Sequence, residues 1–187
     1  MAWAAPRTWA TSELVTSSLM NTHLRDNLLA LKAPYARVTT DIPVNSTTTE
    51  TTLLTFSLAA NDLSANGGLW IKLWGSYTQN ASTSGTFRLK IGATTIASRG
   101  GIFGLNSASE QQWWVNAFIL AQNSTSSQDG VIEYGSGPTA FVGGHGRGTA
   151  AENTTGALTV LVSYQWAAST ASFNLNAGFC LAMLTGP

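Results

Sequence analysis

The stretch LWIKLWGSY at residues 69–77 alternates between two sets of side chains. A period of two places Trp70, Lys72 and Trp74 on one face of a β-strand and Ile71 and Leu73 on the other. Both faces therefore carry large apolar groups, whereas a sheet in a monomeric sandwich buries only one face. The stretch predicts a strand whose second face is covered by the N-terminal segment or a neighbouring subunit, unless the tryptophans belong to ordinary core and rim packing.

Similar strand signals recur from residue 36 onward, separated by segments rich in Gly, Ser, Thr and Asn. We expect about eight strands, near 37–44, 52–58, 69–77, 86–92, 113–121, 130–134, 158–167 and 172–184. Their spacing favours an antiparallel sandwich, and eight strands in two sheets is the jelly-roll number. The strands do not alternate with helices, so a parallel α/β sheet is unsupported. The prediction is an all-β, jelly-roll-like sandwich.

One short helix is expected before these strands, over residues 16–32. Thr16 can cap its first turn, and Pro34 forces the residue before it out of the helical conformation. The apolar residues fall at steps of four, four and three and form one stripe, namely Met20, Leu24, Leu28 and Leu31. A helix of this length is marginal in water by itself. The stripe therefore needs a cover, either its own β domain, sister helices or another protein.

Residues 1–15 are predicted to form an extended arm that carries Trp3 and Trp9. The chain accordingly divides into an arm and helix at 1–35, which serve anchoring or oligomerisation, and a β-sandwich domain at 36–187.

The composition excludes several classes of partner. Charged residues make up 10% of the 187 residues, and nine basic residues balance nine acidic ones. A neutral chain lacks the basic surface that nucleic acid requires, and an anionic membrane surface is disfavoured for the same reason. No apolar run is long enough to span a bilayer. We expect neither nucleic acid nor membrane as a partner.

No catalytic set is apparent in the sequence. His23 and His145 are the only histidines, which excludes a metal site built from several histidines of one chain, and the nine carboxylates are scattered. The single cysteine, Cys180, lies in an apolar run and reads as a small buried hydrophobe. We predict that the protein is not an enzyme and needs no metal or cofactor.

The segment FVGGHGRGTAAEN at 141–153 is rich in glycine. It lacks the strand-to-helix context and the Lys-Ser/Thr pair of a phosphate-binding loop. We expect an inter-strand loop here, with His145 and Arg147 as candidate contacts to a partner or glycan. A second loop tip offers Tyr77 and Asn80 in the same role.

The N-terminal sequence TWATSELVTSSLMNTHLRDNLLALK resembles a signature of many virion proteins of tailed bacteriophages, in which a Trp precedes VT, then (M/L)NTH, one variable residue and RDNL. Matching positions are Trp9, Val15, Thr16, Met20, Asn21, Thr22, His23, Arg25, Asp26, Asn27 and Leu28. The stretch GGLWIKLWGSYTQNASTSGTFRLKIGATTIA at 67–97 is similar to the β domain that often follows. Together the two regions cover about a third of the chain.

The resemblance implies a virion structural protein, assembled in the host cytoplasm and built as a homotrimer of jelly rolls. A short chain with one arm and one sandwich favours a capsid decoration, or cement, protein that binds the major capsid protein through its arm. The alternative is a tail-fibre or minor tail protein that contacts other tail proteins and binds a receptor or host surface glycan. The residues expected to anchor the protein are Trp3, Trp9, Leu14, Met20, His23, Arg25, Asp26 and Asn27. The alternative interpretation is that the polar residues among them only form a solvated face of the helix.

Overall fold

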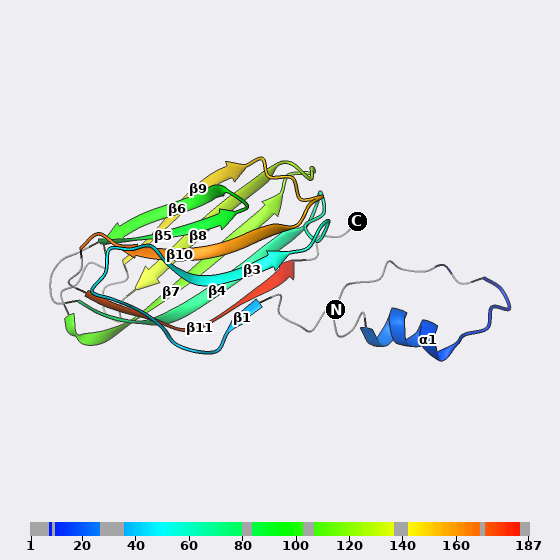
Figure 1. Cartoon of the computed structure of the whole chain (residues 1–187), viewed down its shortest axis with the longest axis horizontal. Coiled ribbons are helices and arrows are strands. Elements are labelled where there is room, and N and C mark those ends of the chain that lie inside the picture. The colour runs from blue at the N-terminus through cyan, green and yellow to red at the C-terminus, as the bar shows by residue number, and fades with distance from the viewer. Residues whose placement is uncertain are drawn as a thin grey trace. The chain divides into compact units, whose positions relative to one another are not determined.

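The protein is represented by a computed structural model that describes residues 8, 10–26, 36–79, 84–102, 107–136, 142–168 and 171–183. The chain divides into two compact units between Pro34 and Tyr35. The first unit carries the helix, and the second is built from strands (Figure 1).

The second unit consists of two antiparallel sheets, which confirms the predicted all-β sandwich. Its strands are β1 (Ala36–Val38), β2 (Ile42–Asn45), β3 (Thr51–Leu58), β4 (Gly68–Gln79), β5 (Ser84–Ile91), β6 (Thr94–Ile102), β7 (Ser107–Ala121), β8 (Gln128–Ser136), β9 (Val142–Ala150), β10 (Leu158–Trp166) and β11 (Ala171–Met183).

The order of the strands is that of a jelly roll with an added hairpin. One sheet runs β1-β11-β4-β7-β8-β9, with β2 also paired to β11, and the other runs β3-β10-β5-β6. The sets β2-β11-β4-β7 and β3-β10-β5-β6 form two four-stranded layers. Apart from the β5–β6 hairpin, successive strands of these layers alternate between the two sheets, as in a jelly roll. The hairpin β8–β9 follows β7 and widens the first layer.

The described residues form eleven strands, so the expected number of about eight was too low. The stretch near 37–44 is two short strands, β1 and β2, that pair with successive parts of β11. Strand β6 was not expected, because TTIASRGG has no sustained apolar alternation. It pairs with β5 through the two-residue turn at Gly92 and Ala93.

The expectation of a loop at 141–153 was wrong, because Val142–Ala150 is the strand β9. Gly144, Gly146 and Gly148 occupy every second position of this strand, on the face toward β6. A Cβ at Gly146 would lie 2.1 Å from the Ser98 carbonyl oxygen, and one at Gly148 would lie 2.3 Å from that of Ile96. Glycine is therefore required at these two positions by the close approach of two backbones.

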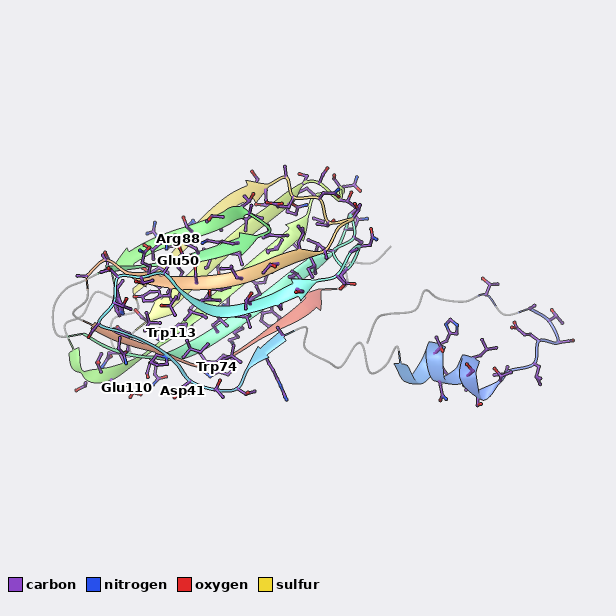
Figure 2. The ribbon with its side chains drawn as sticks, in the orientation of Figure 1. Asp41, Glu50, Trp74, Arg88, Glu110 and Trp113 are labelled. Atoms are coloured by element: carbon purple, nitrogen blue, oxygen red, sulfur yellow. The ribbon has the colours of Figure 1, made fainter. Side chains whose placement is uncertain are left out.

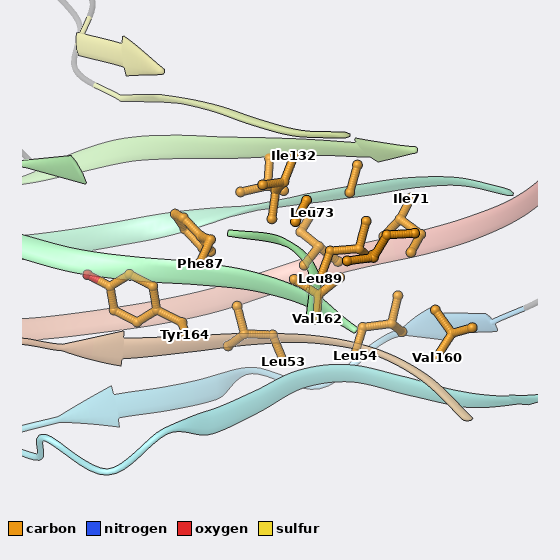
Figure 3. Packing of buried hydrophobic residues seen from close by; sticks show 14 of the residues in the cluster. Leu53, Leu54, Ile71, Leu73, Phe87, Leu89, Ile132, Val160, Val162 and Tyr164 are labelled. Atoms are coloured by element: carbon orange, nitrogen blue, oxygen red, sulfur yellow. The ribbon is translucent and has the colours of Figure 1, made fainter. Parts of the chain in front are cut away.

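The core lies between the two sheets and takes residues from nearly every strand (Figure 3). Its centre is aromatic: the Phe87 ring lies 4.8 Å from that of Tyr164 and 5.6 Å from that of Trp113. Two buried indoles also donate hydrogen bonds to backbone carbonyls, Trp113 to Ser76 at 3.2 Å and Trp166 to Val44 at 3.1 Å. The second bond joins β10 of the small sheet to β2 of the large one.

The first unit begins its helix where the sequence predicts. α1 spans Ser17–Met20, and the Thr16 hydroxyl accepts a hydrogen bond from the Leu19 amide at 3.3 Å. From Asn21 to Asp26 the helix continues with the wider π geometry, as the segment η1. The expected α-helical stripe is therefore altered after Met20, because a π turn bonds residues five apart. The remainder of the predicted helix, residues 27–32, lies outside the described part of the chain.

Candidate functional site

The candidate site is the outer face of the large sheet, over strands β4 and β7. Alternation directs Ile71 and Leu73 of β4, and Val115 and Ala117 of β7, into the core, where each is fully buried. The intervening residues stand on the opposite face: Trp70, Lys72 and Trp74 on β4, and Trp114, Asn116 and Phe118 on β7. The predicted division of the 69–77 stretch into two faces is confirmed.

Strand register joins these six side chains into three rows across the sheet. Trp70 lies opposite Phe118, Lys72 opposite Asn116, and Trp74 opposite Trp114. The Trp70 and Phe118 rings have parallel planes, 1° apart, with centroids separated by 6.4 Å. Aromatic rows thus flank a polar row on both sides.

An open hollow of about 530 Å³ lies between these rows. The described residues that line it are Trp70, Lys72, Trp74, Trp114 and Asn116. Trp74 is 38% exposed, which makes it one of the large hydrophobic residues that the described structure leaves open to solvent. Trp113, the neighbour of Trp114 on β7, belongs instead to the core and is 2% exposed; Figure 2 labels it together with Trp74. The volume falls in the range of small-molecule sites, about 300–1,000 Å³.

The polar row extends beyond the hollow across four strands. Asn116 of β7 lies opposite Glu133 of β8, which in turn lies opposite His145 of β9. Neither Lys72 nor Glu133 forms an ion pair within the described part of the chain. The Asn116 Oδ1 is buried and accepts no hydrogen bond from any described residue. A buried acceptor in that state costs about 1–3 kcal/mol, so it is an unusual feature for a structural position.

His145 and Arg147, predicted as contacts on a loop, do not lie in a loop. His145 and Arg147 stand exposed on strand β9, on the same face as Glu133. Arg147 is engaged with Asp129 of β8, its Nε lying 3.0 Å from Oδ1. This hydrogen-bonded guanidinium lowers the pKa of the Asp129 carboxyl. Arg147 is thus held at the sheet surface rather than at a free loop tip.

Tyr77 is not available to a partner, contrary to the prediction. It lies on β4, four residues after Leu73 and therefore on the same inward face of the strand, and it is 3% exposed. Asn80, its expected neighbour at the loop tip, lies outside the described residues.

The predicted anchor residues of the first unit are described only in part. Leu14 is 80% exposed and Met20 is 42% exposed, while His23 is half-buried. Arg25 and Asp26 lie in the π-helical segment. Trp3, Trp9 and Asn27 fall outside the described residues.

The sequence did not single out Asn116 or Glu133. Both lie in strands recognised from their apolar residues, but the row they form with Lys72 depends on pairing between strands far apart in the chain. The available signal was the outward position of Asn116 between Trp114 and Phe118 in WWVNAFILA.

Within the described residues, no group of three His, Cys, Asp or Glu side chains is placed to hold a metal ion. None of the helical segments described is long and apolar enough to cross a membrane.

Neither a family model nor a curated protein matches the chain. Among solved structures it is similar to the CBM2 module of the evolved Dit of Lactobacillus casei BL23 phage J-1, with a TM-score of 0.37 and 11% identity over 71% of this chain and 69% of that one. It is also similar to the lectin UEA-II complexed with galactose, with a TM-score of 0.35 and 9% identity over 70% of this chain and 78% of that one. Likenesses this distant carry no argument about what the chain binds.

Proposed function

We propose that this chain is a non-catalytic structural protein of a tailed-phage virion, attached to the particle by its N-terminal unit. The observation that carries the proposal is the apolar exposure of that unit. Leu14, Val15, Met20 and Leu24 are 80%, 51%, 42% and 51% exposed. These residues lie within the N-terminal sequence that resembles phage virion proteins.

Such exposure is unfavourable unless a partner covers it. Burying one Leu or Met side chain stabilises a complex by about 1.5–3 kcal/mol. The described part of this helix has four α-helical residues followed by six π-helical ones, which is shorter than the about 12–15 residues that an isolated helix needs to persist in water. A partner surface would therefore both bury the apolar groups and stabilise the helix.

The finer form of the proposal is a homotrimeric capsid decoration protein, whose arm binds the major capsid protein. Three linked copies bind with avidity, so a weak individual contact suffices. The second candidate is a tail-fibre or minor tail protein with a ligand-binding jelly roll. The aromatic hollow favours this second candidate, since a protein that only reinforces a capsid needs no such site on its outer sheet.

The test supplies either the full chain or a variant lacking residues 1–34 to a phage whose own copy of the gene has been removed. The truncated jelly roll should no longer copurify with particles, whereas the full chain should restore normal occupancy. Gold labelling of the full-length protein should mark either the head or the tail and so decide between the two candidates. Full occupancy by the truncated protein would overturn the attachment proposal, and turnover of host envelope polysaccharide would contradict the non-catalytic assignment.

A further inference from the structure

The hollow on the outer face of β4 and β7 has no part in the attachment proposed above. We infer that it is a binding site for a neutral oligosaccharide. Trp70, Trp74 and Trp114 would pack against the apolar faces of the sugar rings, while Lys72, Asn116 and Glu133 would hydrogen-bond to their hydroxyls. The inference deepens the second candidate function by naming the ligand class of the hollow, but it does not depend on the attachment proposal or on whether the protein lies on the head or the tail.

The aromatic side chains are spaced for more than one sugar ring. Trp70 and Trp74 stand four residues apart on the same face of β4, so their Cα atoms lie about 13 Å apart. That span is longer than a single pyranose ring. Trp114 lies opposite Trp74, and Phe118 lies opposite Trp70, which widens each end into an aromatic pair. Indole combines a large apolar surface with an N–H donor, which suits a ligand with C–H and hydroxyl groups.

The polar row between the aromatic pairs supplies both hydrogen-bond donors and hydrogen-bond acceptors for hydroxyl groups. A sugar hydroxyl both donates and accepts, so its site should offer both functions. The Lys72 ammonium donates, the Glu133 carboxylate accepts, and the Asn116 amide between them does both. The Asn116 Oδ1 is buried and accepts no bond from any described residue. Rotation about χ2 turns either end of the amide toward the hollow that it lines.

Other occupants fit this face less well. An apolar protein surface would take Lys72, Asn116 and Glu133 out of water without giving them partners, and interface cores are depleted of such charged residues. Single-stranded nucleic acid also stacks on aromatic side chains, but it requires a positively charged groove. Here Glu133 lies in the same row as Lys72, and the chain as a whole is neutral. A neutral ligand rich in hydroxyls matches both the row and the rings.

The experiment applies the full-length protein to a printed array of neutral hexose and N-acetylhexosamine oligosaccharides. The strongest binder is then titrated by calorimetry against wild type, Trp74→Ala, Asn116→Ala and Leu120→Ala. Leu120 is an exposed apolar residue of β7 that does not line the hollow, so Leu120→Ala is the matched control. Trp74→Ala and Asn116→Ala should each weaken binding about tenfold or more, since both remove a central contact. Leu120→Ala should bind like wild type, and salt should have little effect because the ligand is uncharged.

Three results would overturn the inference. The first is that no oligosaccharide on the array binds at millimolar concentration, and the second is equal weakening by Trp74→Ala and Leu120→Ala. The third is a change in the sedimentation coefficient of Trp74→Ala, which would identify the face as a contact between copies of this chain. Circular dichroism should show that the Trp74→Ala protein is folded, because Trp74 is partly exposed. Particles carrying Trp74→Ala should retain normal occupancy, so failure of this inference is separable from failure of the attachment proposal.

Discussion

Single residues explain two features of the sandwich that cannot be inferred from the amino-acid composition. The first is the glycine alternation of β9, in which Gly144, Gly146 and Gly148 face β6 while His145 and Arg147 face outward. A glycine in a strand usually weakens it, but here the space of a side chain is occupied by the backbone of β6 at Gly146 and Gly148 and by the Arg99 side chain at Gly144.

Gly146→Ala should destabilise the protein by about 1–3 kcal/mol, because its Cβ would lie 2.1 Å from the Ser98 carbonyl oxygen. That oxygen belongs to the backbone of a paired strand, which cannot move away without disturbing the sheet. The matched control is Gly156→Ala, whose Cβ would meet nothing nearer than 3.8 Å. That variant should remain within about 0.5 kcal/mol of wild type. Urea unfolding measures both, and equal stability of the two variants would contradict the close approach of β9 to β6.

The second feature is Glu50, which joins charged groups on the outer face of the small sheet. Its Oε1 lies 2.6 Å from the Lys90 Nζ and also accepts a hydrogen bond from the buried Ser163 hydroxyl. Arg88 lies on the same face, with its Nη1 3.6 Å from Glu50 Oε2 (Figure 2). The hydrogen bond from Lys90, followed by that from Ser163, lowers the pKa of Glu50 below its ordinary value of 4.5.

A lowered folded-state pKa means that Glu50 stabilises the protein above pH 4.5, and that this contribution disappears as the pH falls through the folded-state pKa. Glu50→Gln should therefore be about 1 kcal/mol less stable than wild type at pH 7, and this difference should vanish in acid, since the amide at position 50 does not titrate. Urea unfolding of both proteins from pH 7 into acid measures how the difference in their free energies of unfolding changes. The control, Glu133→Gln, should follow wild type. Parallel acid loss in wild type and Glu50→Gln would show that other carboxyls carry the effect.

At the scale of elements, the sandwich is joined by contacts that cross between its layers. The Trp166 indole on β10 reaches the carbonyl of Val44 on β2, and its ring lies 5.1 Å from that of Tyr164 at a steep angle. The contact connects the short edge strand β2, which has only four residues, to the centre of the opposite sheet.

Trp166→Phe keeps an aromatic ring but removes the donor to Val44. It should lower the free energy of unfolding by about 1–3 kcal/mol, because the buried carbonyl loses that partner. Hydrogen exchange should also rise selectively in β2. The same substitution at the partly exposed Trp74 should change stability by no more than about 0.5 kcal/mol. Uniform exchange changes across the sandwich would argue against a local role for the Trp166 bond.

At the scale of the whole molecule, the described core belongs entirely to the second unit. Its buried cluster runs from Val44 to Trp166, with partly buried neighbours from Ala36 onward. The first unit contributes none of these residues, and its described apolar side chains are largely exposed.

Residues 35–187 alone should therefore melt within about 2 °C of the full chain, since a change of 1 kcal/mol moves the midpoint of such a protein by about 2–4 °C. Calorimetry measures the midpoint, and sedimentation compares the oligomeric state of the two forms. A fall of 10 °C or more would show that the N-terminal unit stabilises the sandwich directly.

Much of this architecture follows from local patterns. The period-two alternation in 69–77 and 113–121 predicts strands and assigns their faces, because neighbouring side chains on a strand point in opposite directions whatever the strand pairs with. The cap at Thr16 is similarly local. In contrast, β9 and β6 were missed, since their inward positions hold glycine or lack sustained apolar character.

The sequence by itself determined the two-layered β architecture and the absence of a recognisable catalytic motif, since both rest on residue types and short-range spacing. Only the tertiary structure decided that Tyr77 is buried, that the 141–153 segment contains a strand, and that Lys72, Asn116 and Glu133 share a row between tryptophans. The physical reason is register. Side-chain alternation is a property of one strand, but the alignment of strands separated by tens of residues is selected by packing of the whole sandwich.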